Sequence, residues 1–301
     1  MTTIRIGTRG SLLSRTQTEH LIQALKACHG DLRVEVVVIR TSGDRMSGPL
    51  WPVGRAGLFV AEIERALLAG EIDLAVHSLK DLPTTPTPGL AIGAIPPRED
   101  PRDVLVANVP SLRALPAGAR VGTASPRRAA QLRAHRPDLQ VVPLRGNVDT
   151  RVRKVHSGEV NAAIVAAAGL LRLGLAHEIA EYLDPSVILP APGQGALAVQ
   201  VRVDDRRMTD LVAPLDDPQS RAATTAERAF LHHLGGGCAI PAAALATCDP
   251  ATRRLQLCAA VASEDGSRVV RIERSGPMEA AERIGQEAAE GLWAAYTVAA
   301  S

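Results

Sequence analysis

The first two hundred residues alternate between short apolar runs and segments of helical periodicity, and this alternation restricts the fold more than any other feature. The apolar runs are typical of strands and cover 4–7, 34–39, 72–78, 90–95, 103–107, 119–123, 139–144 and 160–167. Helical patterns lie between them, near 11–28, near 58–69, and after Pro126 and Asn147. Strands that alternate with helices predict mostly parallel sheets covered by helices.

The pattern restarts at residue 103, which predicts two α/β units, and a further strand pattern at 196–202 follows the second unit. From residue 218 the organisation changes. A helix at about 218–234 precedes a glycine cluster, two strand-like stretches at 255–263 and 268–275, and a helix at about 277–297. This arrangement predicts a third domain of the α+β class.

Composition argues against several classes of function. The 301 residues are 46% apolar with a formal net charge of +2, which gives no reason to expect a nucleic-acid or membrane partner. Aromatic residues, on which single-stranded nucleic acids stack, make up only 2%. No apolar run approaches the roughly 20 residues of a membrane span. The first residues contain no signal-peptide core, so we expect a cytoplasmic protein.

The candidate site lies where the predicted strands end, because open α/β sheets bind ligands at the carboxyl ends of their strands. The turns that follow four of the strands carry polar or basic residues, namely Arg9 and Ser11, Lys80 and Asp81, Ser125 to Arg128, and Arg145 with Asn147 and Arg151. If both sheets face one cleft, five or six arginines surround a single aspartate there.

The Ser125-Pro126 step predicts a helix start that binds an anion, because serine caps helices well and proline suits the first helical position. Arg127 and Arg128 oppose the helix dipole there, and such a broken rule often marks a function. The alternative is an exposed basic turn.

Asp81 follows a buried-type strand and is expected to stay ionised among cations. It can stabilise a cationic intermediate or move a proton, and the alternative is a structural ion pair with Lys80 or an arginine. His77, in the same strand, is expected to be buried or hydrogen-bonded.

Cys238 lies in the sequence GGGCAIP (235–241), where the glycines permit close approach of the backbone to a ligand. A thiol there is either a nucleophile or attachment point, or a buried structural cysteine. Cys28, Cys248 and Cys258 fall on helix or strand patterns and are expected in the core. The four cysteines form no CxxC pair and no zinc-like spacing with histidine, so no metal site and no disulfide framework is expected.

Seven segments, taken in order and with their spacing, resemble the hydroxymethylbilane synthase (porphobilinogen deaminase) family. They are AVHSLKDLP (75–83), REDPRDVLVA (98–107), VGTASPRRAAQL (121–132), LRGNVDTR (144–151), AAAGLLRLGL (166–175), LPAPGQGALA (189–198) and AERAFLHHLGGGCAIP (226–241). The resemblance implies two doubly wound α/β domains that resemble the type-two periplasmic binding protein fold, and a smaller α+β C-terminal domain. The implied boundaries are 1–96 with 194–214, 99–190 and 217–301, with the active site between the first two domains.

The resemblance also implies the reaction, in which four porphobilinogen molecules condense with loss of ammonia into the linear tetrapyrrole hydroxymethylbilane, a step of porphyrin and heme biosynthesis. Cys238 matches the cysteine that holds a dipyrromethane cofactor through a thioether, and Asp81 matches the catalytic aspartate, with Lys80 beside it. Residues that match substrate-binding positions are Arg9, Ser11, Gln17, Thr123, Ser125, Arg127, Arg128, Arg145, Asn147, Arg151 and Gln194. The implied state is a monomer that hands its product to uroporphyrinogen-III synthase.

Two positions depart from the family pattern. The loop before GLFV usually carries one or two lysines, whereas Arg55 is the cation in the aligned stretch 51–56, and Gly235 stands where relatives often have glutamate. We expect the loop at 42–57 to act as a lid.

Two other functions stay open. A non-catalytic binding module for dicarboxylates accounts for the fold and the arginines, but not for Asp81 or Cys238. A catalytically weakened paralogue accounts for the loop departure.

Overall fold

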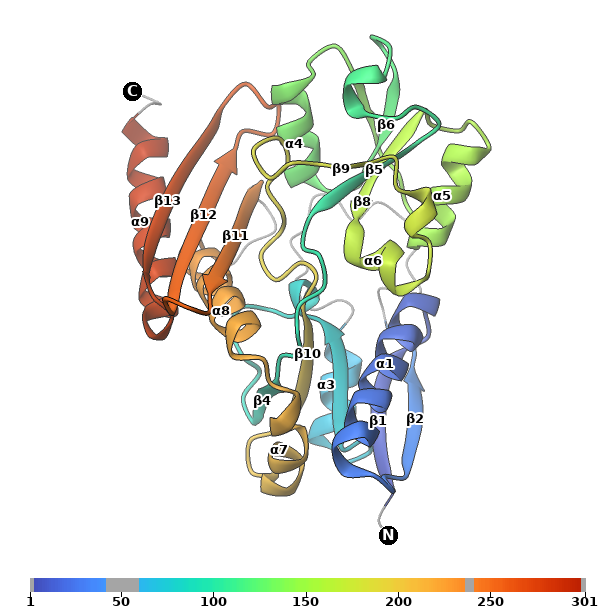
Figure 1. The fold of residues 1–301 in the computed structure, drawn as a ribbon, viewed down its shortest axis with the longest axis vertical. Coiled ribbons are helices and arrows are strands. Elements are labelled where there is room, and N and C mark those ends of the chain that lie inside the picture. The colour runs from blue at the N-terminus through green and yellow to red at the C-terminus, as the bar shows by residue number, and fades with distance from the viewer. Residues whose placement is uncertain (1–2, 42–59, 236–240, 299–301) are drawn as a thin grey trace. The chain divides into compact units, whose positions relative to one another are not determined.

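The computed structural model describes residues 3–41, 60–235 and 241–298. The chain divides into two compact units, of which unit 1 contains Met1–Arg98 with Ala196–Arg221 and unit 2 contains Glu99–Gly195 with Ala222–Ser301. Figure 1 shows the course of the chain. No helix among the described residues is long and apolar enough to cross a membrane. The predicted lid at 42–57, with Arg55, and Cys238 lie outside the described residues.

Unit 1 contains a five-stranded sheet in the order β2-β1-β3-β10-β4. The strands are β1 (Ile4–Arg9), β2 (Val34–Ile39), β3 (Leu74–Ser78), β4 (Leu90–Ala94) and β10 (Leu197–Arg202). β1, β2 and β3 are parallel, and β10 runs antiparallel to both of its neighbours. The helices are α1 (Leu12–His29), α3 (Ala61–Leu68) and α7 (Arg206–Val212).

Helices cover both faces of this sheet because its strands are apolar on both sides. α1 buries Leu21, Ile22 and Leu25, a helical spacing, against Ile4 and Ile6 of β1. α3 buries its own apolar residues against the opposite face, where Ile72 and Ala75 lie. The last turn of α1 is exposed throughout, so the prediction that Cys28 is a core residue is wrong.

The first sheet of unit 2 also has five strands, in the order β7-β6-β8-β5-β9. These are β5 (Asp103–Ala107), β6 (Arg120–Gly122), β7 (Gln140–Val142), β8 (Ala162–Ala166) and β9 (Glu181–Tyr182), with helices α4 (Pro126–His135), α5 (Val148–His156) and α6 (Ala167–Arg172). Three strands are parallel, and β5 is antiparallel to β8 and β9. The two sheets therefore share one pattern of strand directions, and the predicted pair of α/β domains is confirmed.

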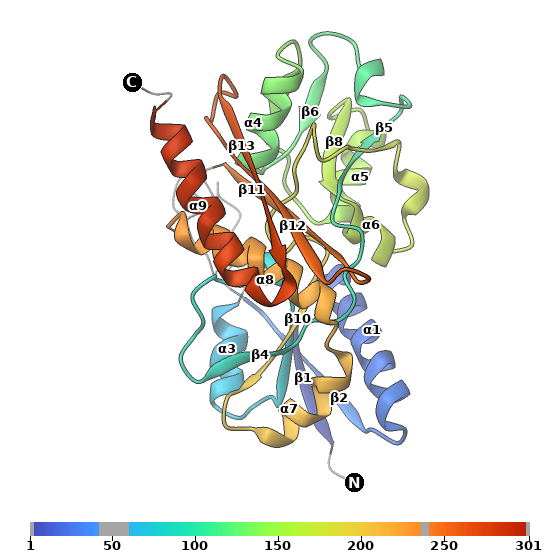
Figure 2. The same ribbon diagram turned by 60° about the vertical axis from the view of Figure 1, so that its left-hand side comes forward.

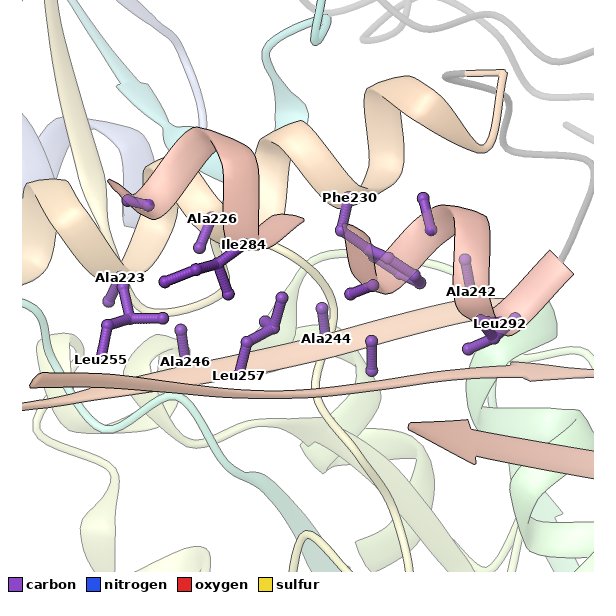
Figure 3. Packing of buried hydrophobic residues seen from close by; sticks show 14 of the residues in the cluster. Ala223, Ala226, Phe230, Ala242, Ala244, Ala246, Leu255, Leu257, Ile284 and Leu292 are labelled. Carbon is purple, nitrogen blue, oxygen red and sulfur yellow. The ribbon is translucent and has the colours of Figure 1, made fainter. Parts of the chain in front are cut away.

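Unit 2 also contains an antiparallel sheet of β11 (Ala242–Asp249), β12 (Arg254–Ala262) and β13 (Val269–Pro277). α8 (Pro218–His233) and α9 (Ala281–Val298) pack on one face of it, and Figure 2 shows α9 running along the sheet. Figure 3 shows Phe230 of α8 and Ile284 of α9 packed with Leu257 of β12 in one core. The predicted α+β domain is confirmed, although its first strand was not predicted.

Short 3-10 helices complete the described structure, at Leu79–Asp81, Leu112–Ala114, Ala176–Glu178, Ala213–Leu215 and Met278–Ala280. The one at Leu79–Asp81 follows β3 directly and holds two of the predicted site residues.

Candidate functional site

In unit 1 the predicted residues gather at the carboxyl edge of the parallel strands. Arg9 ends β1, and Ser11 caps α1, where its Oγ accepts a hydrogen bond from the Ser14 amide (3.2 Å). Gln17, in the second turn of α1, donates from Nε2 to the Oγ of Ser78 at the end of β3 (3.2 Å). This bond ties the helix start to the strand end that leads into Asp81.

Asp81 is presented to solvent by a rigid turn. Leu79 is fully buried, and its amide donates to the carbonyl of Ala196 (3.0 Å), so the turn is fixed from below. Lys80 and Asp81 are both exposed. Asp81 forms no ion pair with any described residue, so the structural ion pair that was the alternative reading is absent from this part of the chain. Its carboxylate is available to a ligand.

Several buried polar side chains form hydrogen bonds to one another next to this sheet. Glu64 of α3 accepts from Thr87 Oγ1 (2.8 Å) through one oxygen and from Gln200 Nε2 of β10 (2.7 Å) through the other. His77 of β3 is buried beside Gln200, as its sequence pattern predicted. Burial lowers the pKa of His77 to about 4, Gln200 opposes this by hydrogen bonding, and the charge of Arg9 lowers it further. The ring is therefore neutral at pH 7.

In unit 2, α4 begins as the Ser125-Pro126 step predicts. Ser125 is the N-cap, its Oγ accepts from the Arg128 amide (3.4 Å), and Pro126 occupies the first turn. Thr123 Oγ1 accepts from the Ser125 amide (3.1 Å) and shapes the turn before the helix. Arg127 and Arg128 are only 6% and 5% exposed. The exposed basic turn that was the alternative is therefore wrong.

Both arginines are held by Asp103, which the sequence reasoning had given no role. The Asp103 side chain is completely buried, because β5 pairs antiparallel with β8 and brings residue 103 to the edge where β8 ends. Its Oδ2 accepts from Arg127 Nη1 (2.7 Å), and its Oδ1 accepts from Arg128 Nη2 (2.6 Å) and Nε (3.0 Å). Burial alone would raise the pKa of Asp103, but the charges of the two arginines outweigh it and hold the pKa well below its usual range.

Arg151 adds a third positive charge to this group. Its Nε donates to the carbonyl of Gly146 (3.0 Å), which holds the side chain at the start of α5. Burial lowers the pKa of Arg151 to about 10, and the charge of Arg128 lowers it further. Arg127 and Arg128 thus share one carboxylate, and Arg151 adds a third positive charge beside Arg128, which leaves an excess of positive charge in this cluster.

Gln194 completes this cluster from another part of the chain. It is fully buried, and its Nε2 donates to Asp103 Oδ1 (2.8 Å) and to the carbonyl of Pro101 (2.8 Å). Gly193 and Gly195 on either side have positive φ values of 73° and 86°. A Cβ on Gly195 would stand 2.3 Å from the carbonyl oxygen of Glu99, so only glycine fits there.

The remaining predicted residues lie nearby or outside the described chain. Arg145 is half-buried in the loop after β7, and Asn147 precedes α5, exposed and with no side-chain capping bond. Cys238 is not among the described residues. In the described ranges, no three His, Cys, Asp or Glu side chains gather in a way that would hold a metal ion.

A polar cavity of about 260 Å³ lies elsewhere in unit 1, at the amino ends of the strands. Arg5 and Asp73 line it and pair with each other at 2.8 Å. None of the predicted site residues borders this cavity.

Sequence reasoning missed three residues that the structure connects to the site. Asp103 could have been identified from the sequence, because a carboxylate at the start of an apolar strand is buried and therefore needs a buried partner of opposite charge. Ser78 had no signal beyond its place two residues before Lys80. Arg172, at the end of α6, donates from Nη2 to the carbonyl of Gly195 (2.6 Å), and burial lowers its pKa to about 10. It lay in a matching segment, but on a helix without polar neighbours.

The described geometry can do two things chemically. The Asp103 cluster offers guanidinium groups with surplus positive charge, which suits ligands that carry several carboxylates. The turn at 79–81 offers a solvent-facing carboxylate on a rigid base, which suits stabilisation of a cation or transfer of a proton.

Comparison with known proteins agrees with this chemistry. Residues 4–210 match the family described as porphobilinogen deaminase, dipyromethane cofactor binding domain, and residues 222–294 match porphobilinogen deaminase, C-terminal domain. The chain is 50% identical over 298 residues to the porphobilinogen deaminase of Acidothermus cellulolyticus, which covers 97% of this chain and 89% of that relative. It is 49% identical over 286 residues to that of Syntrophobacter fumaroxidans, which covers 94% and 92%.

Solved structures match more distantly. The periplasmic VFT2 domain of Bordetella pertussis BvgS matches with a TM-score of 0.42 and 17% identity, over 70% of this chain and 85% of that one. A nutrient binding protein from Burkholderia cenocepacia bound to methionine matches with a TM-score of 0.41 and 14% identity, over 70% and 89%. The sequence matches, which span both parts of the chain at about half identity, are decisive: the chain belongs to the porphobilinogen deaminase family.

Proposed function

We propose that this protein condenses four porphobilinogen molecules stepwise into hydroxymethylbilane, primed by a dipyrromethane held as a thioether on Cys238. The observation that carries the proposal is the surplus of positive charge around Asp103, where Arg127 and Arg128 share one carboxylate and Arg151 lies close enough for its charge to act on that of Arg128. Each pyrrole brings two carboxylates, so a growing chain accumulates negative charge that this cluster can neutralise.

The donor set fits a dipyrromethane with acetate and propionate arms. Guanidinium groups bind carboxylates in a planar, bidentate way, and the start of α4 adds backbone amides that favour anions. When bound, the dipyrromethane supplies the nucleophilic pyrrole carbon that begins the chain. The matched binding residues are proposed to hold the arms of cofactor and substrate, and they are Arg9, Ser11, Gln17, Thr123, Ser125, Arg127, Arg128, Arg145, Asn147, Arg151 and Gln194.

Asp81 is the proposed catalytic residue. When the C–N bond of porphobilinogen breaks, the amine leaves as ammonia and a positive charge develops on the pyrrole. An exposed carboxylate on a fixed turn stabilises that charge, and it can accept the proton released when the new C–C bond forms. Lys80, beside it and also exposed, is proposed to help position substrate carboxylates.

The setting of the enzyme follows from the same assignment. We propose that it acts as a cytoplasmic monomer in tetrapyrrole biosynthesis and releases hydroxymethylbilane to a uroporphyrinogen-III synthase. Sedimentation equilibrium of the protein at the concentration used for activity assays tests this, because a monomer gives the mass of a single chain.

Intact mass spectrometry of the isolated protein tests the proposal directly. The wild-type chain should be heavier than its sequence by one dipyrromethane and should give colour with Ehrlich's reagent. Cys238→Ser should lose the adduct, the colour and the turnover, while Cys28→Ser serves as a control because that thiol is exposed and lies outside the GGGCAIP sequence. An unmodified but active wild-type protein would refute the assignment, and an unmodified, inactive one would favour a binding module.

A further inference from the structure

A second buried carboxylate of unit 2, Glu227, stands outside every role assigned so far. It lies on α8 and is 0% exposed. Its Oε2 accepts a hydrogen bond from the amide of Gly193 (2.6 Å), and its Oε1 accepts one from the amide of Ala246 on β11 (2.8 Å). A carboxylate is costly to bury unless it is hydrogen-bonded. When its two oxygens accept from backbone amides of two different segments, it holds those two segments in place relative to each other.

The first of these segments, residues 189–195, is hydrogen-bonded directly to the Asp103 cluster. The carbonyl of Leu189 accepts from Arg127 Nη1 (2.6 Å). At the other end, Gln194 donates to the same Asp103 oxygen that holds Arg128. The segment is buried along almost its whole length, so a shift of its backbone would move partners of both arginines.

The second segment connects to the elements that flank the cofactor cysteine in the sequence. α8 ends at His233 and β11 begins at Ala242, so Cys238 falls between them. Glu227 joins these two elements through the Ala246 amide. The carbonyl of Pro190 joins the 189–195 segment to the same strand by accepting from the Ala244 amide (3.0 Å).

We propose that Glu227 is a positioning residue, which fixes the 189–195 segment, and with it the Asp103 cluster, relative to the two elements that flank Cys238. This inference rests on the proposed function, since it concerns how the anchored chain meets the arginines. A small misplacement of such groups is enough to slow a reaction without abolishing binding.

Glu227→Gln tests the proposal, because it keeps the shape but turns one acceptor into an N–H₂ group that faces a backbone donor. Hydrogen exchange should speed up at Gly193 and Ala246. The variant should still carry dipyrromethane by intact mass, kcat should fall on the order of tenfold, and KM should change much less. Asp217→Asn is the matched control, because Asp217 is a carboxylate with the same kind of role at the start of the same helix, where its side chain accepts from the Ser220 amide (2.7 Å). It should keep kcat.

The outcomes separate the two proposals. A wild-type protein without dipyrromethane overturns the proposed function itself. A loaded wild type together with a Glu227→Gln variant that loses amide protection but keeps wild-type kcat overturns only the positioning role. If Glu227→Gln does not fold, Glu227→Asp decides, since it keeps the charge but is one methylene too short to reach both amides. A reduced kcat at unchanged KM supports the proposal, and a wild-type kcat overturns it.

Discussion

Replacing Asp103 by asparagine should destabilise the protein far more than an ordinary charge removal. The substitution keeps the size of the side chain but removes the negative charge that two almost completely buried arginines share. It also replaces one oxygen by an N–H₂ group, which would face either Arg127 Nη1 or the donors of Arg128 and Gln194. Two guanidinium groups would then be buried without a counter-charge.

The expected cost follows from this geometry. Removing one partner of a buried ion pair costs about 3–5 kcal/mol, and asparagine keeps one acceptor, so we expect about 3 kcal/mol. For a chain of 301 residues that corresponds to a Tm lower by roughly 5 °C, measured by thermal unfolding at pH 7. Asp100→Asn is the control, because Asp100 pairs with Arg102 at 2.6 Å on a partly exposed surface, where a pair contributes about 1 kcal/mol or less.

The pH dependence gives a second check with a defined sign. Because the pKa of Asp103 is lowered in the folded state, its contribution is fully present above the usual aspartate pKa near 4 and is lost only as pH falls below that value. The stability difference between wild type and Asp103→Asn should therefore be constant from pH 5 to 8 and shrink in acid. Equal Tm values at pH 7 would refute the idea that this carboxylate compensates the buried arginines.

Three further predictions concern other groups. Asp81→Asn should keep the wild-type Tm while kcat falls more than KM rises, because the carboxylate acts on charge that develops in the transition state; an unchanged kcat contradicts this role. The pKa of His77 in the folded protein is about 4, against an ordinary value near 6.5. The free energy of unfolding of the wild type should therefore be constant above pH 6.5 and decrease by about 3 kcal/mol as the pH falls toward 4. If His77→Gln showed the same decrease, groups other than His77 would be responsible for it. Arg145→Leu and Arg151→Leu should accumulate covalent intermediates of different length by mass spectrometry; a uniform rise in KM with no stalled species would show that the arginines do not act in stages.

The sequence predicted the alternating elements well because local periodicity determines them. The cap at Ser125 and the burial of His77 are also local properties, and both are confirmed. β11 was missed because its alanine-rich sequence has one β-branched residue, Thr247, and no aromatic residue, and these residue types mark strands. Its alanines are buried by pairing with β12 and packing under α8.

Long-range pairings escaped sequence reasoning for a different reason. Asp103 meets Arg127 only because an antiparallel strand enters the sheet in a particular register, and no spacing along the chain encodes that. Glu227 falls on an ordinary helical pattern, and only the fold brings the Gly193 amide to it. Residue types and strand ends thus indicate which kinds of functional group lie near the site. The hydrogen-bond partner of each group depends on the order and register of the strands, which the sequence pattern does not reveal.

The strand order of unit 1 has a consequence for how the chain folds as it is synthesised. β3 and β4 do not pair with each other, since β10 lies between them and pairs with both. Until the ribosome has released residues 197–202, β3 has one open edge and β4 has no partner at all. All five strands of unit 2's first sheet are therefore synthesised before the amino-terminal sheet can be completed, and the open strand edges of that sheet can pair wrongly during this interval.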